Sequence, residues 1–233
     1  MTDLLDYDLT DGIATITLDD GKANTMSLKM LQALNAALDR AEADQAIVVL
    51  GGRAGMFCGG FDLAVFKRGA QEQLEMLQAG ARMTARLLAF PAPVVVACSG
   101  HAIAMGVFLV LCGDVRVGVD QGATIQVNEV QIGLTLPRFA IEVCRQRLAP
   151  AHFNLATLTA RRYSGEQAVA AGFLDLVVEP ALLAHNAREQ AVGLQKLHRD
   201  SFTATKLRLR QPTLVALQTG IDQDIAGWAA RIG

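Results

Sequence analysis

One carboxyl group stands in an otherwise apolar stretch of the chain. Glu129 lies within Gln126-Val127-Asn128-Glu129-Val130-Gln131-Ile132-Gly133. Burial raises the pKa of a carboxyl group, and a carboxylate with a raised pKa can act as a general base near neutral pH. A solvated carboxylate at the end of a strand would give the same residue types. Glu129 taken alone therefore remains either a base or an ordinary surface acid.

A pair of glycines follows a predicted buried strand, in Phe57-Cys58-Gly59-Gly60-Phe61-Asp62-Leu63. Consecutive glycines let the backbone approach a ligand closely and direct its N–H groups toward that ligand. Strand-to-Gly-Gly turns without a ligand are also common, so this motif is weak when taken alone.

A second loop, Ser99-Gly100-His101-Ala102-Ile103-Ala104-Met105-Gly106, precedes an apolar helix. The first turn of a helix presents unpaired N–H groups and the positive end of the helix dipole. Such a place suits an oxyanion that develops during a reaction. An ordinary tight connection between a strand and a helix is an equally good interpretation of this segment alone.

Alternating strands and helices must position these segments, which predicts an α/β fold. Strands are expected at 12–18, 46–50, 94–98 and 115–119, and helices at 28–41 (with Ser27 as N-cap), 71–89 and 106–112. Residues 99–105 are expected to form a loop. The rest of the chain reads as mostly helical, with Pro137, Pro150, Pro180 and Pro212 at helix starts.

Charge and cysteine content narrow the functional classes. The 233-residue chain has a formal net charge of −2 and no block of basic residues, which argues against a nucleic-acid partner. Four cysteines in apolar stretches, without metal-ligand spacing, predict reduced thiols in a cytoplasmic protein and no metal site. Residues 87–113 carry no formal charge, but the prolines and glycines within them favour strand, loop and helix over a membrane span.

The order and spacing of the three motifs resemble the crotonase (enoyl-CoA hydratase/isomerase) superfamily. Further segments agree with this resemblance, which runs from about residue 5 to residue 210. The first is Lys22-Ala23-Asn24-Thr25-Met26-Ser27, the second is Cys112-Gly113-Asp114-Val115-Arg116, and the third begins at Tyr163-Ser164-Gly165-Glu166-Gln167-Ala168.

The resemblance implies a crotonase (ClpP-like) α/β fold, in which repeated ββα units form a spiral core with a helical C-terminal region. We expect the core at 1–195 and a short helical region at 196–233, which contributes to trimerisation and is truncated relative to the family. Homotrimers, or hexamers built as dimers of trimers, are implied as well. The apolar helices 106–112 and 137–148 could supply their contacts.

The resemblance also implies roles for individual residues. The backbone N–H groups of Phe61 and Met105 would form an oxyanion hole for the enolate of an acyl-CoA thioester, with Glu129 as acid and base. CoA is then part of the substrate, and no separate cofactor is expected. Asp62 would order its loop as an acceptor, and His101 would fill space. Residues expected to contact CoA are Lys22, Ala23, Cys58, Gly60, Asp62 and Leu63.

One departure from the family pattern favours a particular reaction. Hydratases of the family use two glutamates, and Phe108 occupies the first of those positions here, while Glu129 occupies the second. A single carboxylate can move a proton from C2 to C4, as in the 3,2-enoyl-CoA isomerases, whose segment Asn128-Glu129…Gly133 resembles. Two alternatives remain: a hydratase or acyl-CoA hydrolase that uses Glu72 or Glu75, and a CoA-binding protein without catalysis.

Two further departures carry expectations of their own. Met105 replaces a glycine of the family and is expected to narrow the pocket. A missing final helix is expected to leave the pocket more open, or closed by a partner subunit. Lys206 and Arg208 are expected either on a solvated helix face or facing CoA phosphates.

Overall fold

The computed structural model describes residues 4–230, so the ends of the two predicted regions (1–3 and 231–233) lie outside the described residues. Two antiparallel strands, β1 (Leu5–Thr10) and β2 (Ile13–Leu18), open the chain. The turn between them places Asp11 and Gly12 at positive φ. Helix α1 (Leu28–Ala43) follows, and the Ser27 side chain caps it by accepting a hydrogen bond from the Met30 N–H. This strand–strand–helix order is then repeated along the chain.

Three further units continue the repeat. The second consists of β3 (Ile47–Gly52), β4 (Gly55–Cys58), a short 3-10 turn (Val65–Lys67) and α2 (Ala70–Ala89). The third consists of β5 (Val94–Cys98), β6 (Gly100–Ile103) and α3 (Met105–Leu111). The fourth consists of β7 (Val115–Val119), β8 (Ile125–Gln126), a 3-10 turn (Val130–Ile132) and α4 (Arg138–Arg145).

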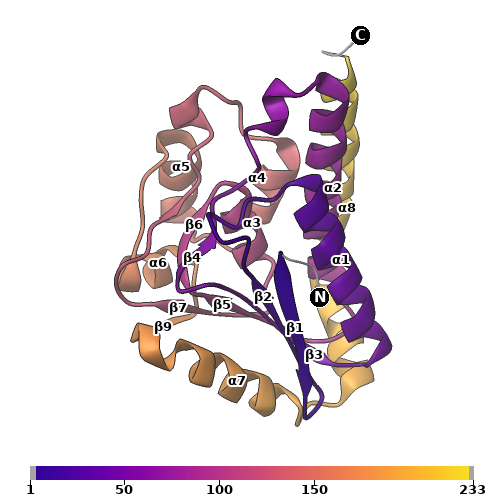
Figure 1. Ribbon diagram of the computed structural model, residues 1–233, viewed down its shortest axis with the longest axis vertical. Coiled ribbons are helices and arrows are strands. Elements are labelled where there is room, and N and C mark those ends of the chain that lie inside the picture. Colours follow the sequence, from indigo (N-terminus) through magenta and orange to yellow (C-terminus); the bar gives the residue numbers. More distant parts are fainter. Residues whose placement is uncertain (1–3, 231–233) are drawn as a thin grey trace.

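The C-terminal part is mainly helical. It contains α5 (Pro150–Thr159), α6 (Gly165–Ala171), β9 (Leu176–Val178), a 3-10 turn (Pro180–Leu182), α7 (Leu183–Leu194) and α8 (Arg199–Ala229). The predicted helical region at 196–233 is thus one long helix where the structure describes it. Helix α8 packs along α2 and α4 on one side of the molecule (Figure 1).

The strands of the units alternate between two sheets. The first strand of each unit enters a six-stranded sheet with the order β1-β2-β3-β5-β7-β9, which is parallel from β2 onward. The second strands of the later units form a small parallel sheet, β4-β6-β8. Successive units therefore wind forward in a spiral, and the turns that follow β4, β6 and β8 are gathered together.

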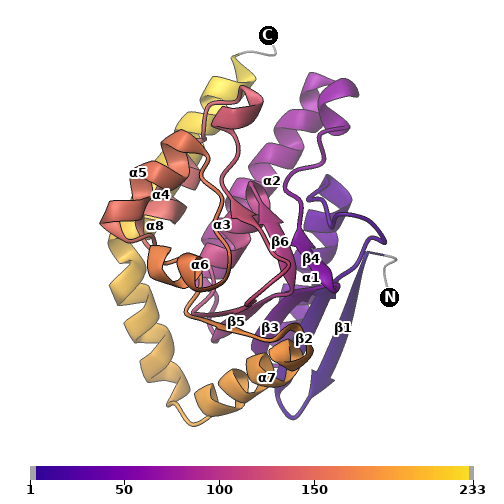
Figure 2. The same ribbon diagram turned by 90° about the vertical axis from the view of Figure 1, so that its left-hand side faces the viewer.

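Both faces of the large sheet are covered. Helix α7 packs on one face against β3, β5 and β7, and it buries Leu183, Ala187 and Ala191 there (Figures 1 and 2). The other face carries the main core beneath α1, α2, α3 and α8. Strands β3 and β5 are continuous apolar runs for this reason, since neither of their faces meets water.

Most of the predicted elements are confirmed, and two predictions are wrong. Residues 99–105 are not all loop, because 100–103 form strand β6, which pairs with β4 and β8. Pro212 lies inside α8 rather than at a helix start. Proline removes one N–H donor from the helix ladder, and the packing of α8 on α2 and α4 supports the helix through that point.

Helix α3 cannot supply contacts between subunits. All seven of its residues are buried within the chain, so the expectation for 106–112 is wrong. The apolar run that suggested an interface instead fills the core. None of the helices in the described part of the chain is both long and apolar enough to cross a membrane.

Candidate active site

The first glycine loop is held by the segment that precedes α1. The Gly59 N–H donates to the Ala23 carbonyl at 2.8 Å, and the Met26 N–H donates to the Gly60 carbonyl at 2.8 Å. Beyond them, Phe61 pairs with Met26 as an isolated parallel bridge. Two segments more than 30 residues apart in sequence thus form one rigid edge.

Asn24 and Arg53 stabilise that edge, and sequence reasoning assigned neither a role there. The Asn24 amide is buried and donates to the carbonyls of Leu18, Met56 and Phe57 at 2.9 to 3.2 Å. The Arg53 Nε donates to the Lys22 carbonyl at 2.8 Å. The positive φ of Asn24 (50°) was the available signal, because a conformation of that kind favours Asn in a tight turn.

The second loop lies directly against the first. Gly60 has φ of 100°, and a Cβ there would lie 3.1 Å from the Ala104 Cβ. A Cβ on Gly106 would lie 2.3 Å from the Cys58 carbonyl oxygen. Only glycine permits this close approach at both positions. The motifs 57–63 and 99–106 are therefore brought together, as their resemblance to one family implied.

The unusual backbone conformation falls on Ala104 and not on Met105. Ala104 precedes α3 with φ of 50° and ψ of −117°, a region that is costly for a residue with a Cβ. Met105 is the first residue of α3, and its side chain is fully buried. The expectation that Met105 narrows the pocket is wrong, because the methionine points into the core beside Gly80.

Two backbone donors remain unused where the loops meet. Within the described residues, no acceptor lies in hydrogen-bonding range of the Phe61 N–H or of the Met105 N–H. Buried or partly buried N–H groups are nearly always paired in folded proteins. Two unpaired donors on adjoining loops therefore form a place where an anionic oxygen would be stabilised.

Glu129 is buried beside these loops without a partner. Its side chain is 7% exposed, and its Oε2 atom has no hydrogen-bond partner in the described part of the chain. Burial raises the pKa of Glu129 to about 7. The predicted pKa shift is thus confirmed in direction and cause, and the group can gain or lose a proton near neutral pH.

One cavity joins Glu129 to the first glycine loop. Its volume is about 230 Å³, and the residues around its inner part include Gly59, Phe61, Ala104, Phe108, Asn128 and Glu129. Phe108 is buried and packs edge-to-face on Phe139 with ring centroids 5.8 Å apart. The place of the family's second glutamate is therefore an apolar wall.

The C-terminal helix covers the outer part of the same cavity. Gln223, Gly227 and Trp228 of α8 line it opposite Gln73 and Leu77 of α2. The Asp224 carboxylate ties α8 to α4 by accepting from the N–H groups of Arg138 and Phe139 at 3.1 and 3.0 Å. The expectation that no final helix covers the pocket is wrong, because α8 covers it from within the chain.

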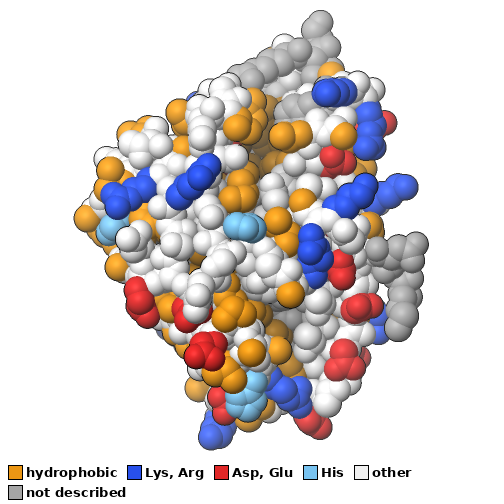
Figure 3. Space-filling view, turned by 60° about the vertical axis from the view of Figure 1, so that its left-hand side comes forward, with side chains coloured by type: hydrophobic (Ala, Val, Ile, Leu, Met, Phe, Trp, Pro, Cys, Tyr) orange, Lys and Arg blue, Asp and Glu red, His pale blue; other side chains and the backbone are white. Residues whose placement is uncertain are grey.

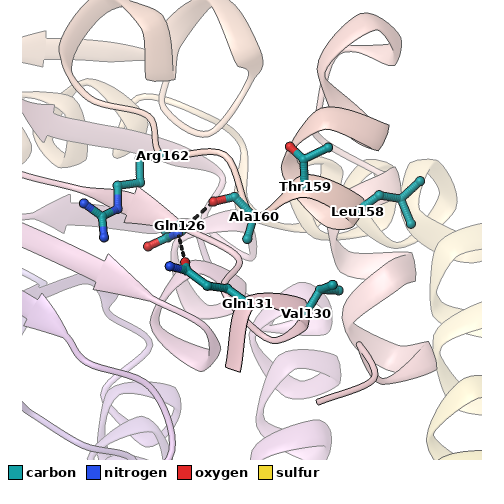
Figure 4. A pocket seen from close by; sticks show the side chains of 7 residues that line it. All are labelled: Gln126, Val130, Gln131, Leu158, Thr159, Ala160 and Arg162. Atoms are coloured by element: carbon teal, nitrogen blue, oxygen red, sulfur yellow. Dashed lines mark hydrogen bonds between the residues drawn. The ribbon is translucent and has the colours of Figure 1, made fainter. Parts of the chain in front are cut away.

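Gln126 anchors the segment that carries Glu129. Its Nε2 donates to the Gln131 Oε1 and to the Ala160 carbonyl, each at 2.7 Å (Figure 4). These bonds hold the turn after Glu129 against the end of α5. A more open hollow of about 380 Å³ lies there, between Val130, Leu158 and Arg162.

The residues predicted to contact CoA are found in different surroundings. Lys22 is exposed on the edge beside the first loop, and Leu63 lines the cavity. Asp62 accepts from the Ala64 N–H at 3.0 Å, which orders the loop as expected. The Cys58 thiol is fully buried and faces away from the cavity, and burial raises its pKa to about 12.

Both expectations for Lys206 are wrong. It lies neither on a solvated face nor toward a ligand, because its Nζ is buried 2.7 Å from the Asp114 Oδ2. Arg208 is exposed, and His101 accepts from the Thr124 N–H through its Nδ1 atom at 3.1 Å. Glu72 and Glu75 are exposed on α2 and do not line the cavity, which leaves Glu129 and Asp224 as its carboxylates.

The family model for enoyl-CoA hydratase/isomerase matches residues 8–230. A relative from Thermus thermophilus, assigned by name to the enoyl-CoA hydratases, is 32% identical over 88% of this chain and 81% of its own. An apo structure of an Mtb enoyl-CoA isomerase is 43% identical, with a TM-score of 0.93 over 97% of this chain and 99% of that one. An enoyl-CoA hydratase from Mycobacterium marinum is 42% identical, with a TM-score of 0.92 over 98% and 99%. The chain has the crotonase fold and belongs to the enoyl-CoA hydratase/isomerase family.

Proposed function

We propose that the protein is an enoyl-CoA isomerase that shifts the double bond of a 3-enoyl-CoA to the 2-position, with Glu129 as its single acid and base. The observation that carries this proposal is that Glu129 is the unpaired carboxylate of a cavity whose opposite wall is Phe108. Hydration needs a group that activates water and a group that handles the α-proton. A 1,3-proton shift needs only one group that takes a proton and returns it.

The reaction follows from the charges that develop. The Glu129 carboxylate takes a proton from C2, and the electron pair moves onto the thioester oxygen. The Phe61 and Met105 N–H groups donate to that oxygen, and removal of one such donor costs about 10²–10³ in rate in other enzymes. The protonated Glu129 then delivers its proton to C4, which forms the 2-enoyl product.

A CoA thioester fits the rest of the site in chemical terms. Lys22, Ala23 and the loop of Cys58, Gly60, Asp62 and Leu63 are the proposed CoA contacts, beside the cavity mouth at Leu63. Lys22 is exposed and can approach a phosphate. CoA enters as part of the substrate, so the proposed reaction uses no separate cofactor.

We also propose that the chain assembles as a homotrimer, or as a hexamer of two trimers. Exposed apolar side chains support association, among them Val130 beside the site and Leu158 on α5. Hydrophobic side chains reach the surface between charged ones on the face drawn in Figure 3. Light scattering coupled to size-exclusion chromatography measures the mass. A cytoplasmic location stays a prediction.

Substitution of Glu129 tests the reaction. Glu129→Gln keeps the size of the side chain but removes the base, so isomerisation of 3-hexenoyl-CoA should slow by about 10²–10⁴. Binding of a saturated acyl-CoA should be retained. Glu72→Gln and Glu75→Gln are the matched controls, because both residues are exposed on α2.

The same assays separate the rival functions. Wild-type turnover by Glu129→Gln would remove Glu129 from the mechanism. Rapid hydration of crotonyl-CoA, lost in Glu72→Gln or Glu75→Gln, would favour the hydratase alternative. Tight acyl-CoA binding without turnover of any thioester would favour a CoA-binding protein that has no catalytic role.

A further inference from the structure

The outer part of the cavity is more polar than a hydrocarbon chain requires. Pockets for apolar groups are lined mainly by apolar side chains, with a few polar groups that recognise specific atoms. Here Gln73, Thr135, Arg138 and Gln223 line the cavity beyond Glu129. They come from α2, from α4 with the segment before it, and from α8, so three parts of the chain bring polar groups to one place.

Arg138 is the cation among the residues that line this cavity. Its side chain makes no ion pair within the described part of the chain. The neighbouring Asp224 does not neutralise the guanidinium, because its two oxygens accept the backbone N–H groups of Arg138 and Phe139. Arg138 thus presents an available positive charge on the cavity wall.

We infer that the acyl group of the substrate ends in a carboxylate that Arg138 binds. A guanidinium matches a carboxylate in both charge and geometry, since two parallel N–H···O bonds can form between them. The side-chain amides of Gln73 and Gln223 can donate to the same group. The substrate class is then a CoA thioester of an unsaturated dicarboxylic acid. The inference rests on the proposed function, because it places the acyl group in this cavity.

Binding of saturated thioesters tests the inference without turnover. Adipoyl-CoA and hexanoyl-CoA have six-carbon acyl chains and differ in the terminal carboxylate, as glutaryl-CoA and pentanoyl-CoA do at five carbons. Isothermal titration calorimetry should give at least one dicarboxylic thioester a Kd about 10-fold below that of its partner. Arg138→Met should reduce that preference to within about 2-fold. Arg138→Lys keeps the charge and should retain more than half of the preference on a logarithmic scale.

Arg145→Met is the matched control, because Arg145 lies on the same helix, is exposed and does not line the cavity. It should leave the preference unchanged, and thermal unfolding shows whether each variant is folded. Equal affinities for both members of each pair, or an unchanged preference in Arg138→Met, overturn the inference alone. Failure of the wild type to bind any acyl-CoA overturns the proposed function and the inference with it.

Discussion

Two buried groups of ionisable residues differ in how completely they are paired. At the first, the Asp114 carboxylate accepts from the Lys206 Nζ at 2.7 Å, from the Arg210 Nη2 at 2.9 Å and from the Val94 N–H at 2.8 Å. At the second, the Glu129 Oε2 has no partner in the described part of the chain. The first group joins α8 to the edge of the sheet, and the second faces the cavity.

The difference shows which buried charge serves the fold. Buried charges are normally paired because desolvation is costly. Lys206 and Arg210 also donate to the carbonyls of Ala92 and Leu88, which completes the first group. An unpaired buried carboxylate is instead typical of a site whose partner arrives with the substrate. Substitutions should therefore have opposite effects on the stability of the two groups.

The largest expected effect is at Asp114. Asp114→Asn leaves Lys206 and Arg210 buried without a counter-charge and should lower the free energy of unfolding by about 3–5 kcal/mol. Urea unfolding followed by circular dichroism measures it. Asp39→Asn, which removes an exposed partner of Arg86, is the control and should cost less than about 1 kcal/mol. Similar losses at the two positions would contradict the assignment of Asp114 as a structural hub.

Glu129→Gln should have the opposite sign. The pKa of Glu129 is raised from 4.5 to about 7, so the native state binds its proton more tightly than the unfolded chain does. Its stabilising contribution is present below about pH 4.5 and is lost as the pH rises through 7. The variant has no such loss and should be about 2 kcal/mol more stable at pH 8, with little advantage at pH 4.5. Equal stability at both pH values would contradict the burial of an unpaired charge.

The pH profile of the reaction should report the same group. Because only the carboxylate form of Glu129 accepts a proton, kcat/KM for isomerisation should fall about 10-fold per pH unit below pH 7. The dissociation constant of a saturated acyl-CoA over the same range is the control, and it should change much less. A flat rate profile between pH 5 and 8 would exclude Glu129 as the ionising base.

The smallest expected effect concerns the strained residue between the loops. Ala104→Gly relieves a conformation that disfavours a Cβ and should raise the free energy of unfolding by about 1 kcal/mol. Ala204→Gly, on the exposed face of α8, should lower it by about 1 kcal/mol. If both changes destabilise the protein equally, Ala104 carries no strain.

Local patterns were sufficient for much of the fold. Periodicity and the Ser27 cap predicted α1, and the apolar runs predicted β3, β5 and β7. The short strands β4, β6 and β8 were missed, because two to four residues in glycine-rich segments carry little pattern of their own. Their pairing becomes favourable only when segments far apart in the sequence meet.

The site was predictable to the extent that its chemistry is local. Glu129 in an apolar stretch indicated a raised pKa, and the glycine loops indicated available N–H groups. Arg138 and Gln223 could not be linked from the sequence, because some 85 residues separate them and only the packing of α8 on α4 brings them together. Lys206 was misjudged for the same reason, since its partner Asp114 lies 92 residues away.

Helix α8 is also a lever between the two groups. Trp228 lies 18 residues beyond Arg210, which at 1.5 Å per residue is about 27 Å along the helix axis. Rotation of the rod by about 2° around its anchored end displaces the far end by about 1 Å, a distance that can alter the alignment of reacting atoms. The bonds of Asp114 at one end and Asp224 at the other thus make the width of the acyl pocket a matter of leverage.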